Sequence, residues 1–419
     1  TCVILDRFAP CLRASVAFAF LRSISPAAQP VGSADNPTGS HAHRIFPPTS
    51  FQTDLSGPGH HFPRISLTKP ERRAASAARN SVSDELLGDD GPYVVSTPDG
   101  GLEACWLGAR RTSGFVRRQR VDIGVELTVP AVGNVPQFRI QLRRSVAAPI
   151  TVFARDTRAF VVGSIHAEYV TTVKLLQSHG VIDSKLKWSF GRNWLAVLGD
   201  LTNHGPSPLP LLWLLYQLEA DAASAGGGVC LLLGNAELEL LLGNGQGLNA
   251  ETTTKALRLG VAAYADLFRP QTVLGDWLRS KPVAVRFNDT VLIHGVVTAA
   301  LSECRLDLAQ INRGTREWLR ATPFDSRPRN HVSIIGWLHA SPAHNMPPRG
   351  HNLLTGPWEE LQSILKFHQA ERIVIAEHIL LSALSFHDGK VVAVDSGRRR
   401  DLRTLEPVIE ALVLERDAM

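Results

Sequence analysis

Polar residues that can bind metal ions stand at the ends of several apolar runs in this sequence. The runs end in "GSIH", "GD", "GN", "HG" and "AEH", at residues 163–166, 199–200, 234–235, 294–295 and 376–378. Carboxylate, amide and imidazole groups suit Mn, Fe or Zn, and two such ions about 3.5–4 Å apart can clamp a phosphoryl oxygen and activate water. The neighbouring glycines allow the sharp turns that backbone beside an ion needs. The pattern therefore predicts a metal site suited to phosphoryl chemistry.

The apolar runs before these residues are predicted to be strands of an α/β fold. Strands are expected within residues 158–165, 193–200, 227–235, 282–287, 290–297, 372–378 and 390–397, and helices within 169–180 and 209–226. Continuous apolar strands joined by helices indicate sheets that are buried on both faces. Sites in such sheets gather where loops leave the carboxyl ends of the strands, which is where the polar residues stand.

Composition divides the chain into three predicted parts. Residues 1–90 are rich in Pro, Gly, Ser and His without a sustained apolar period, which predicts a disordered leader or targeting segment. Within it, "RASVAFAFLRSIS" at 13–25 fits either a signal peptide or a transit peptide, so the compartment stays open. Short alternating runs broken by Gly and Pro predict a small β-rich subdomain at 91–150, and the α/β pattern covers 151–419.

Bulk properties exclude several classes of protein. An apolar fraction of 44% fits a globular protein with a sizeable core, and no apolar run reaches the length of a membrane span. The five cysteines are scattered without a CxxC pair, which argues against a zinc ribbon or a disulfide scaffold. Lys and Arg are dispersed at a net charge of +5, so there is no clear signal for nucleic acid, and "RRR" at 398–400 is expected to be a solvated face.

The order of these segments resembles the calcineurin-like metallophosphoesterases, and among them the Shewanella-like protein-phosphatase branch. That family carries the motifs GDxHG (or SDIEG), GDxxDRG, GNHE, HGG and GHT, and this chain has "VVGSIHAEY", "LAVLGDLTNHG", "CLLLGNAELELLLG", "VLIHGVV" and "RIVIAEH" in the same order. The likeness covers roughly residues 155–417 and includes the connecting segments "VIDSKLKWSFG" and "GDWLRSKP". It implies a four-layer α/β/β/α sandwich preceded by a small N-terminal β region.

Carried over by motif, the resemblance implies a set of metal ligands in this chain. They are His166, Asp200, Asn235, His294 and Glu377, with Asp200 at the bridging position. Ser164 stands where the first motif has an aspartate ligand, and His378 follows Glu377. Both are candidates for a substitute ligand or acid, although a serine hydroxyl is a poorer ligand than a carboxylate.

Three positions that carry catalysis in the family are substituted here, so no residue is assigned as catalytic. Ala236 stands in place of the catalytic histidine, Asn203 in place of the aspartate that orients it, and His204 in place of a phosphate-binding arginine. Alanine cannot donate a proton, and loss of a general acid typically costs about 10²–10⁴ in rate. Histidine cannot make the planar bidentate grip of a guanidinium on phosphate. Glu237 is expected to be a loop or helix-cap carboxylate rather than a replacement acid.

Three functions stay open on the sequence alone. The first is a phosphatase-like fold whose phosphomonoester hydrolysis is lost or strongly weakened, with one divalent transition metal (Mn, Fe or Zn) or none, and with phosphoryl-ligand binding retained. The second is an active metal-dependent phosphatase for a phosphorylated protein or a small phosphomonoester, with His204 or His378 as the acid. The third is a non-catalytic module that binds a partner.

Overall fold

The computed structural model describes residues 90–415 except for 98, 109–114, 144–149, 154–156, 246–247, 249, 296–304, 322–323, 325–356, 377–382, 395–399, 402–403 and 405–406. The predicted leader or targeting segment therefore lies outside the described residues, apart from Asp90. No helix in the described part is long and apolar enough to cross a membrane.

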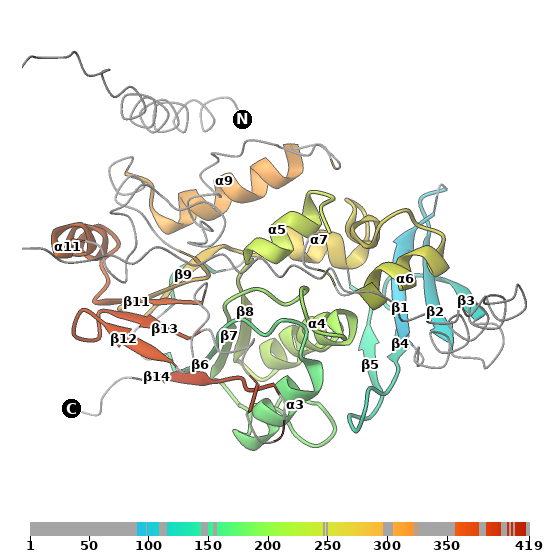
Figure 1. The fold of residues 1–419 in the computed structure, drawn as a ribbon, viewed down its shortest axis with the longest axis horizontal. Coiled ribbons are helices and arrows are strands. Elements are labelled where there is room, and N and C mark those ends of the chain that lie inside the picture. The colour runs from blue at the N-terminus through green and yellow to red at the C-terminus, as the bar shows by residue number, and fades with distance from the viewer. Residues whose placement is uncertain are drawn as a thin grey trace, which may run out of the picture.

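Two sheets form the centre of the molecule (Figure 1). The first has the order β14-β6-β7-β8, and its strands are β14 (Ala411–Leu414), β6 (Ala159–Val162), β7 (Trp194–Val197) and β8 (Gly228–Leu231). The second has the order β12-β13-β11-β10-β9, and its strands are β12 (Leu384–Phe386), β13 (Val391–Ala393), β11 (Arg372–Ile375), β10 (Thr290–Ile293) and β9 (Ala284–Phe287). β6, β7 and β8 run parallel, as do β10, β11 and β13, so each group presents its carboxyl ends at one edge.

The two sheets pack face to face around a core of their own. Its buried members come from both sheets and from the segment before β6: Phe153, Ala159, Val161, Ala196, Leu198, Cys230, Leu232, Val285, Phe287, Leu292, Val374, Ala376, Val394 and Leu414. The rings of Phe153 and Phe287 stack with their centroids 3.8 Å apart. Cys230 is one of these core side chains, and burial raises the pKa of its thiol to about 12.

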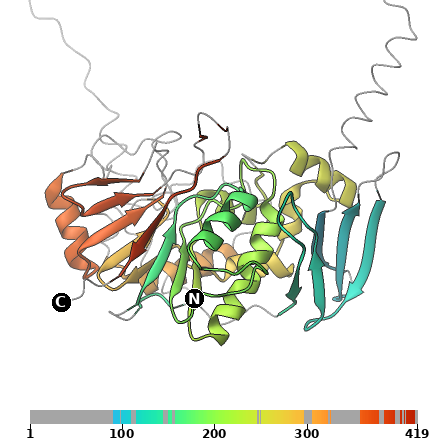
Figure 2. The same ribbon diagram turned by 90° about the horizontal axis from the view of Figure 1, so that it is seen from below.

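Helices cover the outer faces of both sheets, which gives the α/β/β/α order that the sequence predicted. α3 (Tyr169–Ser178) and α4 (Pro208–Ser224) lie over the first sheet, while α9 (Leu308–Ala321) and α11 (Trp358–Phe367) lie over the second (Figures 1 and 2). Buried Asn312 ties α9 to β9, because its side-chain oxygen accepts hydrogen bonds from the backbone N–H groups of Val283 at 2.8 Å and Ala284 at 3.2 Å.

The strands predicted from apolar runs are confirmed, with β6, β8 and β10 buried along their whole length. α3 ends as expected, since Gly180 follows its C-cap with a φ of 67°. Two strands, β12 and β14, are not marked by an apolar run in the sequence. β12 is three residues long with two of them exposed, and β14 has one buried residue in four, so neither shows the continuous apolar run of an inner strand.

A small β region packs against α4 at one end of the molecule (Figure 2). Its strands are β1 (Asp90–Ser96), β2 (Leu102–Gly108) and β3 (Phe115–Val121) in one antiparallel sheet and β4 (Glu126–Val129) with β5 (Phe138–Gln141) in a hairpin. The indole of Trp213 in α4 donates a hydrogen bond to the carbonyl of Pro92 at 2.8 Å. The remaining elements are α5 (Asn235–Leu241), α6 (Ala250–Leu259), η1 (Tyr264–Phe268) and α7 (Val273–Arg279).

A buried imidazole after α11 makes the stability of this fold depend on pH. The pKa of His368 is lowered from 6.5 to about 4, chiefly by burial; nearby Asp307 opposes the change and Arg286 adds to it. The unfolded chain binds a proton below pH 6.5 that the native imidazole binds only near pH 4. The contribution of neutral His368 to the stability of the native state is therefore complete above pH 6.5. It is lost progressively as the pH falls toward 4.

We expect His368→Leu to flatten the loss of stability between pH 6.5 and 4, because leucine binds no proton in either state. Urea unfolding midpoints at several pH values in this window measure the effect. His179→Gln, at an exposed position after α3, serves as the matched control. Equal pH slopes for wild type and His368→Leu would contradict the assignment.

Candidate functional site

Three loops meet where they leave the carboxyl ends of β6, β7 and β8, and the end of β10 faces them. The loops are residues 163–168, 198–207 and 232–235. Parallel neighbours place such ends at one edge of a sheet, so residues far apart in sequence come together. Four of the five predicted metal-ligand positions are in this group: His166, Asp200, Asn235 and His294. Glu377 and His378 lie outside the described residues.

Two glycines let the second and third loops approach backbone to backbone. A Cβ on Gly234 would lie 2.6 Å from the backbone nitrogen of Asp200, and one on Gly199 would collide with the backbone of Gly234. Gly199 also has a φ of 90°, which other residues rarely adopt. The glycines before Asp200 and Asn235 are therefore required by this close approach.

Asp200 lies at the centre of the site. Its Oδ1 accepts a hydrogen bond from the backbone N–H of Ala236 at 3.1 Å and is 3.5 Å from Nε2 of His294. Its Oδ2 accepts from the Asn203 amide at 3.3 Å and is 3.8 Å from Nδ1 of His166. Burial by itself raises the pKa of this carboxyl, but the two imidazoles and the two donors lower it below its usual value. The group is consequently held as an anion in a buried place.

His294 presents one ring nitrogen to two oxygens. Its Nδ1 lies 2.6 Å from the carbonyl oxygen of Leu198 and donates to it, since a carbonyl can only accept. Nε2 then faces Oδ1 of Asn235 at 3.2 Å and Oδ1 of Asp200 at 3.5 Å. An imidazole fixed by an Nδ1–H bond to a backbone carbonyl is a common arrangement for a metal ligand. These three converging electron-rich atoms fit one divalent cation.

Of the three candidate ligand atoms, only two belong to His or Asp side chains, and the third is the amide oxygen of Asn235. Among the described residues, no group of three or more His, Cys, Asp and Glu side chains is arranged to hold a metal ion. A position with amide, imidazole and carboxylate donors favours a borderline cation such as Mn, Fe or Zn.

The residues at the other predicted metal position do not fit a second cation. Ser164 is 1% exposed, and its hydroxyl donates to the carbonyl of Ala376 at 2.7 Å, so it supplies no negative charge. The amide of Asn203 joins His166 to Asp200, because its oxygen lies 2.8 Å from Nδ1 of His166 and its nitrogen donates to Asp200. Asp200 is thus the only carboxylate available there among the described residues.

Ala236 and His204 lie at the positions where the resemblance expects an acid and a phosphate-binding arginine. Ala236 is buried in the first turn of α5, and its methyl group has no proton to donate. The His204 side chain is exposed, and its ring centroid is 5.2 Å from that of His166, at an interplanar angle of 67°. An imidazole therefore remains at the rim of the site.

The site loops hold strained backbone. His166, Ala167, Asp200 and His204 have φ values of 52°, 58°, 54° and 62°, in the left-handed region. Such conformations cost about 1–3 kcal/mol each for residues with a Cβ, and they cluster at functional sites. Two backbone bonds secure them: His166 N–H to the Asp200 carbonyl at 2.7 Å and Gly205 N–H to the His166 carbonyl at 2.8 Å.

The Glu237 carboxylate connects the second loop to the third. It is fully buried; its Oε2 accepts from the N–H groups of Gly234 at 3.0 Å and Asp200 at 2.9 Å, and its Oε1 accepts from the N–H of Leu201 at 2.7 Å. The hydroxyl of Thr202 donates to Oε1 at 3.1 Å. Burial and the neighbouring Asp200 raise the pKa of this carboxyl, and the N–H donors oppose the rise.

The predicted helix-cap role of Glu237 is confirmed, since it is the third residue of α5 and its carboxylate accepts from the backbone N–H of the N-cap residue Gly234. The bonds to Asp200 and Leu201 were not anticipated, because no local spacing indicates contacts across 37 and 36 residues.

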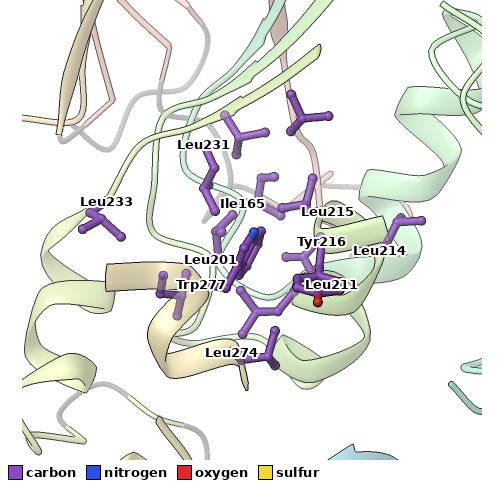
Figure 3. Packing of buried hydrophobic residues seen from close by; sticks show 14 of the residues in the cluster. Ile165, Leu201, Leu211, Leu214, Leu215, Tyr216, Leu231, Leu233, Leu274 and Trp277 are labelled. Atoms are coloured by element: carbon purple, nitrogen blue, oxygen red, sulfur yellow. The ribbon is translucent and has the colours of Figure 1, made fainter. Parts of the chain in front are cut away.

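Apolar side chains anchor the same loops in the core. Figure 3 shows Ile165 and Leu201, one from each of two site loops, among buried residues such as Leu231 of β8, Leu215 of α4 and Trp277 of α7. In each of these two loops a buried apolar residue therefore stands between two polar residues.

An ion pair that the sequence did not indicate ties the first loop to the C-terminal part of the chain. Arg400 donates to the carboxylate of Glu168 at 2.8 Å, and the Glu168 side chain is largely buried. The run at 398–400 was expected to be a solvated face; Arg400 is half-exposed and paired, and the other two arginines lie outside the described residues.

We expect Glu237→Gln to destabilise the protein by about 2–3 kcal/mol, because an amide nitrogen would face buried N–H donors. Thermal or urea unfolding measures the change. Glu239→Gln, two residues along the same helix and partly exposed, is the matched control. A Glu237→Gln variant as stable as this control would contradict the described role.

Comparison with models of known protein families gives no match. A curated relative, Shewanella-like protein phosphatase 2 of Arabidopsis thaliana, is 28% identical over 88 residues, which are 21% of this chain and 22% of that protein. The match thus spans about a fifth of the relative's length.

Solved structures match over a larger part of the chain. The structure of a cold-active protein tyrosine phosphatase of a psychrophilic Shewanella species has a TM-score of 0.61 and 24% identity, covering 74% of this chain and 91% of that one. A mutant of a cold-active protein tyrosine phosphatase gives the same TM-score and coverage at 25% identity.

The two packed sheets, with polar loops meeting at the carboxyl ends of their strands, have the fold of the phosphatases in these solved structures. These similarities support the resemblance to the calcineurin-like metallophosphoesterases, and among them to the Shewanella-like protein-phosphatase branch, that the sequence motifs indicate.

Proposed function

We propose that this protein is a phosphatase-like metallophosphoesterase that holds one divalent cation and a phosphoryl ligand, and that its hydrolysis of phosphomonoesters is lost or strongly weakened. The observation that carries the proposal is the environment of Ala236. This residue is the second of α5 and lies beside Asp200, with its N–H bound to the central carboxylate and a methyl group in place of a proton donor.

Asp200, Asn235 and His294 would hold the cation, which when bound would polarise a phosphoryl oxygen. Hydrogen bonds within the protein already orient the His294 and Asp200 side chains. The carbonyl of Leu198 keeps the His294 proton on Nδ1, so that Nε2 faces the two oxygens. The amide of Asn203 holds the second oxygen of Asp200 and leaves Oδ1 directed toward His294.

The described residues lack the two groups that phosphomonoester hydrolysis would need next. A leaving oxygen requires a proton, and removing the donor typically costs about 10²–10⁴ in rate. A phosphoryl group requires a firm grip, and the exposed imidazole of His204 offers a single donor where a guanidinium offers a planar pair. The lack of a proton donor and of a guanidinium lowers turnover, but neither change prevents the binding of a phosphoryl ligand.

A phosphorylated protein or a small phosphomonoester is the ligand class that we propose. The names of the relatives support the first, since they are called a protein phosphatase and a protein tyrosine phosphatase. The charge of the centre supports both, because a cation beside Asp200 would attract a phosphoryl dianion.

A second candidate function is an active phosphatase that uses His204 as the acid. The observation in its favour is the exposed His204 ring, which lies 5.2 Å from the ring of His166 at the rim of the site. This arrangement would deliver a proton from solvent, in contrast to the buried Ala236.

We expect Mn²⁺ or Zn²⁺ to raise the melting temperature of the wild type, since a ligand at 100 times its Kd stabilises the native state by about 2.7 kcal/mol. Asp200→Asn and His294→Ala should abolish the shift and the metal content found by elemental analysis. His179→Ala, at an exposed position, is the control. A melting temperature that no metal changes would contradict the proposal and favour a partner-binding module.

We expect a variant with Ala236→His, Ser164→Asp, Asn203→Asp and His204→Arg to hydrolyse an aryl phosphate with Mn²⁺ at least ~10²-fold faster than the wild type. The change restores a proton donor, an orienting carboxylate, a ligand and a phosphate grip on the same scaffold. Adding Asp200→Ala to this variant is the control and should remove the gain. A wild type that turns over at enzyme-like rates, with activity lost in His204→Ala, would instead establish the second candidate.

A further inference from the structure

Three residues of α9, Arg313, Arg316 and Arg320, form an arginine stripe along one side of this helix. They are three and four residues apart, a spacing that makes side chains neighbours on a helix surface. The opposite, inner face of α9 consists of the buried residues Leu308, Ile311, Asn312, Thr315 and Leu319. Figure 1 shows α9 on the outer side of the second sheet, so the stripe lies on a helix at the surface of the domain.

The positive charges of the arginine stripe have no acidic partner. Arg313 and Arg320 are exposed and Arg316 is partly buried, and none of the three side chains forms an ion pair or a hydrogen bond with a described residue. Glu317 is the one acidic residue of α9, and its carboxylate is likewise not paired with any residue in the described part of the chain. Three guanidinium groups against one carboxylate leave the helix with a formal surplus of two positive charges.

The three arginines are close enough to repel one another. Burial lowers the pKa of Arg316, the positive charges of Arg320 and Arg313 lower it further, and Glu317 opposes the change. One guanidinium nitrogen of Arg316, Nη1, is buried without a hydrogen-bond partner among the described residues. Like charges at this spacing destabilise a helix. An anion held by the exposed Arg313 and Arg320 would relieve the repulsion without having to reach the buried nitrogen.

The length and charge of the arginine stripe suit a short anionic segment of polypeptide. At a rise of 1.5 Å per residue, Arg313 and Arg320 are about 10 Å apart along the helix axis. An extended peptide covers this distance with about three residues. A phosphoryl group carries a charge of about −1.5 to −2 at pH 7, which matches the surplus on α9, and its three oxygens can accept from more than one guanidinium group.

The other helix over the second sheet argues against a longer polyanion. Glu359 and Glu360 lie in the first turn of α11, and Glu359 is exposed. A nucleic acid or an anionic membrane that extended from α9 across α11 would meet these carboxylates. The basic surface on this side of the domain is therefore matched to a local ligand.

We propose that the arginine stripe binds a phosphorylated segment of a partner protein. The phosphoryl group accepts hydrogen bonds from the exposed guanidinium groups of Arg313 and Arg320, and its charge compensates that of Arg316. This docking requires neither a cation nor hydrolysis at the candidate metal site, so it does not depend on the proposed function.

The test is calorimetric titration of the metal-free full chain with the peptide acetyl-Gly-Asp-phosphoserine-Asp-Gly amide. It should bind saturably and at least about tenfold more tightly than the same peptide with serine, because charged hydrogen bonds are lost with the phosphoryl group. Added salt should weaken the binding. Equal affinity for the two peptides would overturn the proposal. Equal or tighter binding of inorganic phosphate or of a short oligothymidylate would do the same, since the ligand would then be a free anion or a nucleic acid.

Arg313→Gln and Arg320→Gln should each weaken the phosphopeptide about threefold or more, and the double variant at least about tenfold, since each change removes a charged donor. Arg192→Gln, at an exposed position in the turn before β7, is the matched control and should keep the wild-type affinity. Unchanged melting temperatures establish that the variants are folded. Wild-type affinity in the double variant, or an equal loss in Arg192→Gln, would contradict the proposal. Either result leaves the metal-dependent proposal untouched, because no metal is present in the titration.

Discussion

The buried carboxylate of Glu237 holds together the loops on which the candidate site depends. It accepts hydrogen bonds from backbone on both sides of the gap between the second and third loops, and it also closes the first turn of α5. The left-handed backbone of Asp200 is held by this acceptor for its N–H and by the donors to its side chain. Glu237 therefore maintains the arrangement of the site loops, and this role is structural rather than catalytic.

The uncharged side chain of Asn203 bridges Asp200 and His166. Its amide donates to Asp200 and its oxygen faces Nδ1 of His166, so one neutral side chain satisfies both neighbours. A second carboxylate at this position would place like charges side by side and would require cations to offset the repulsion. The hydroxyl of Ser164 is likewise bonded within the protein, to the carbonyl of Ala376.

Most of the fold could be predicted from the sequence, because inner strands buried on both faces are continuous apolar runs and their ends carry glycine beside a polar residue. β6, β8 and β10 follow this rule. β12 and β14 could not be found in the same way, since they are short and mostly exposed and owe their conformation to pairing with β13 and β6. The convergence of His166, Asp200, Asn235 and His294 followed from topology, whereas the cross-loop bonds of Glu237 and the Arg400–Glu168 pair depend on tertiary distances that no spacing encodes.

The pairing of β14 with β6 also bears on how the domain can fold. Ala411 pairs with Val162 and Leu414 with Ala159, so the sheet that carries three site loops is completed by residues some 250 positions later in the chain. Contacts of such long range must overcome a large loss of chain entropy before they stabilise anything. Until residue 414 has been synthesised, one edge of β6 has no partner from this strand. Assembly of the first sheet can therefore be completed only after β14 has been synthesised, and the pairing of this last strand with β6 is a closing step.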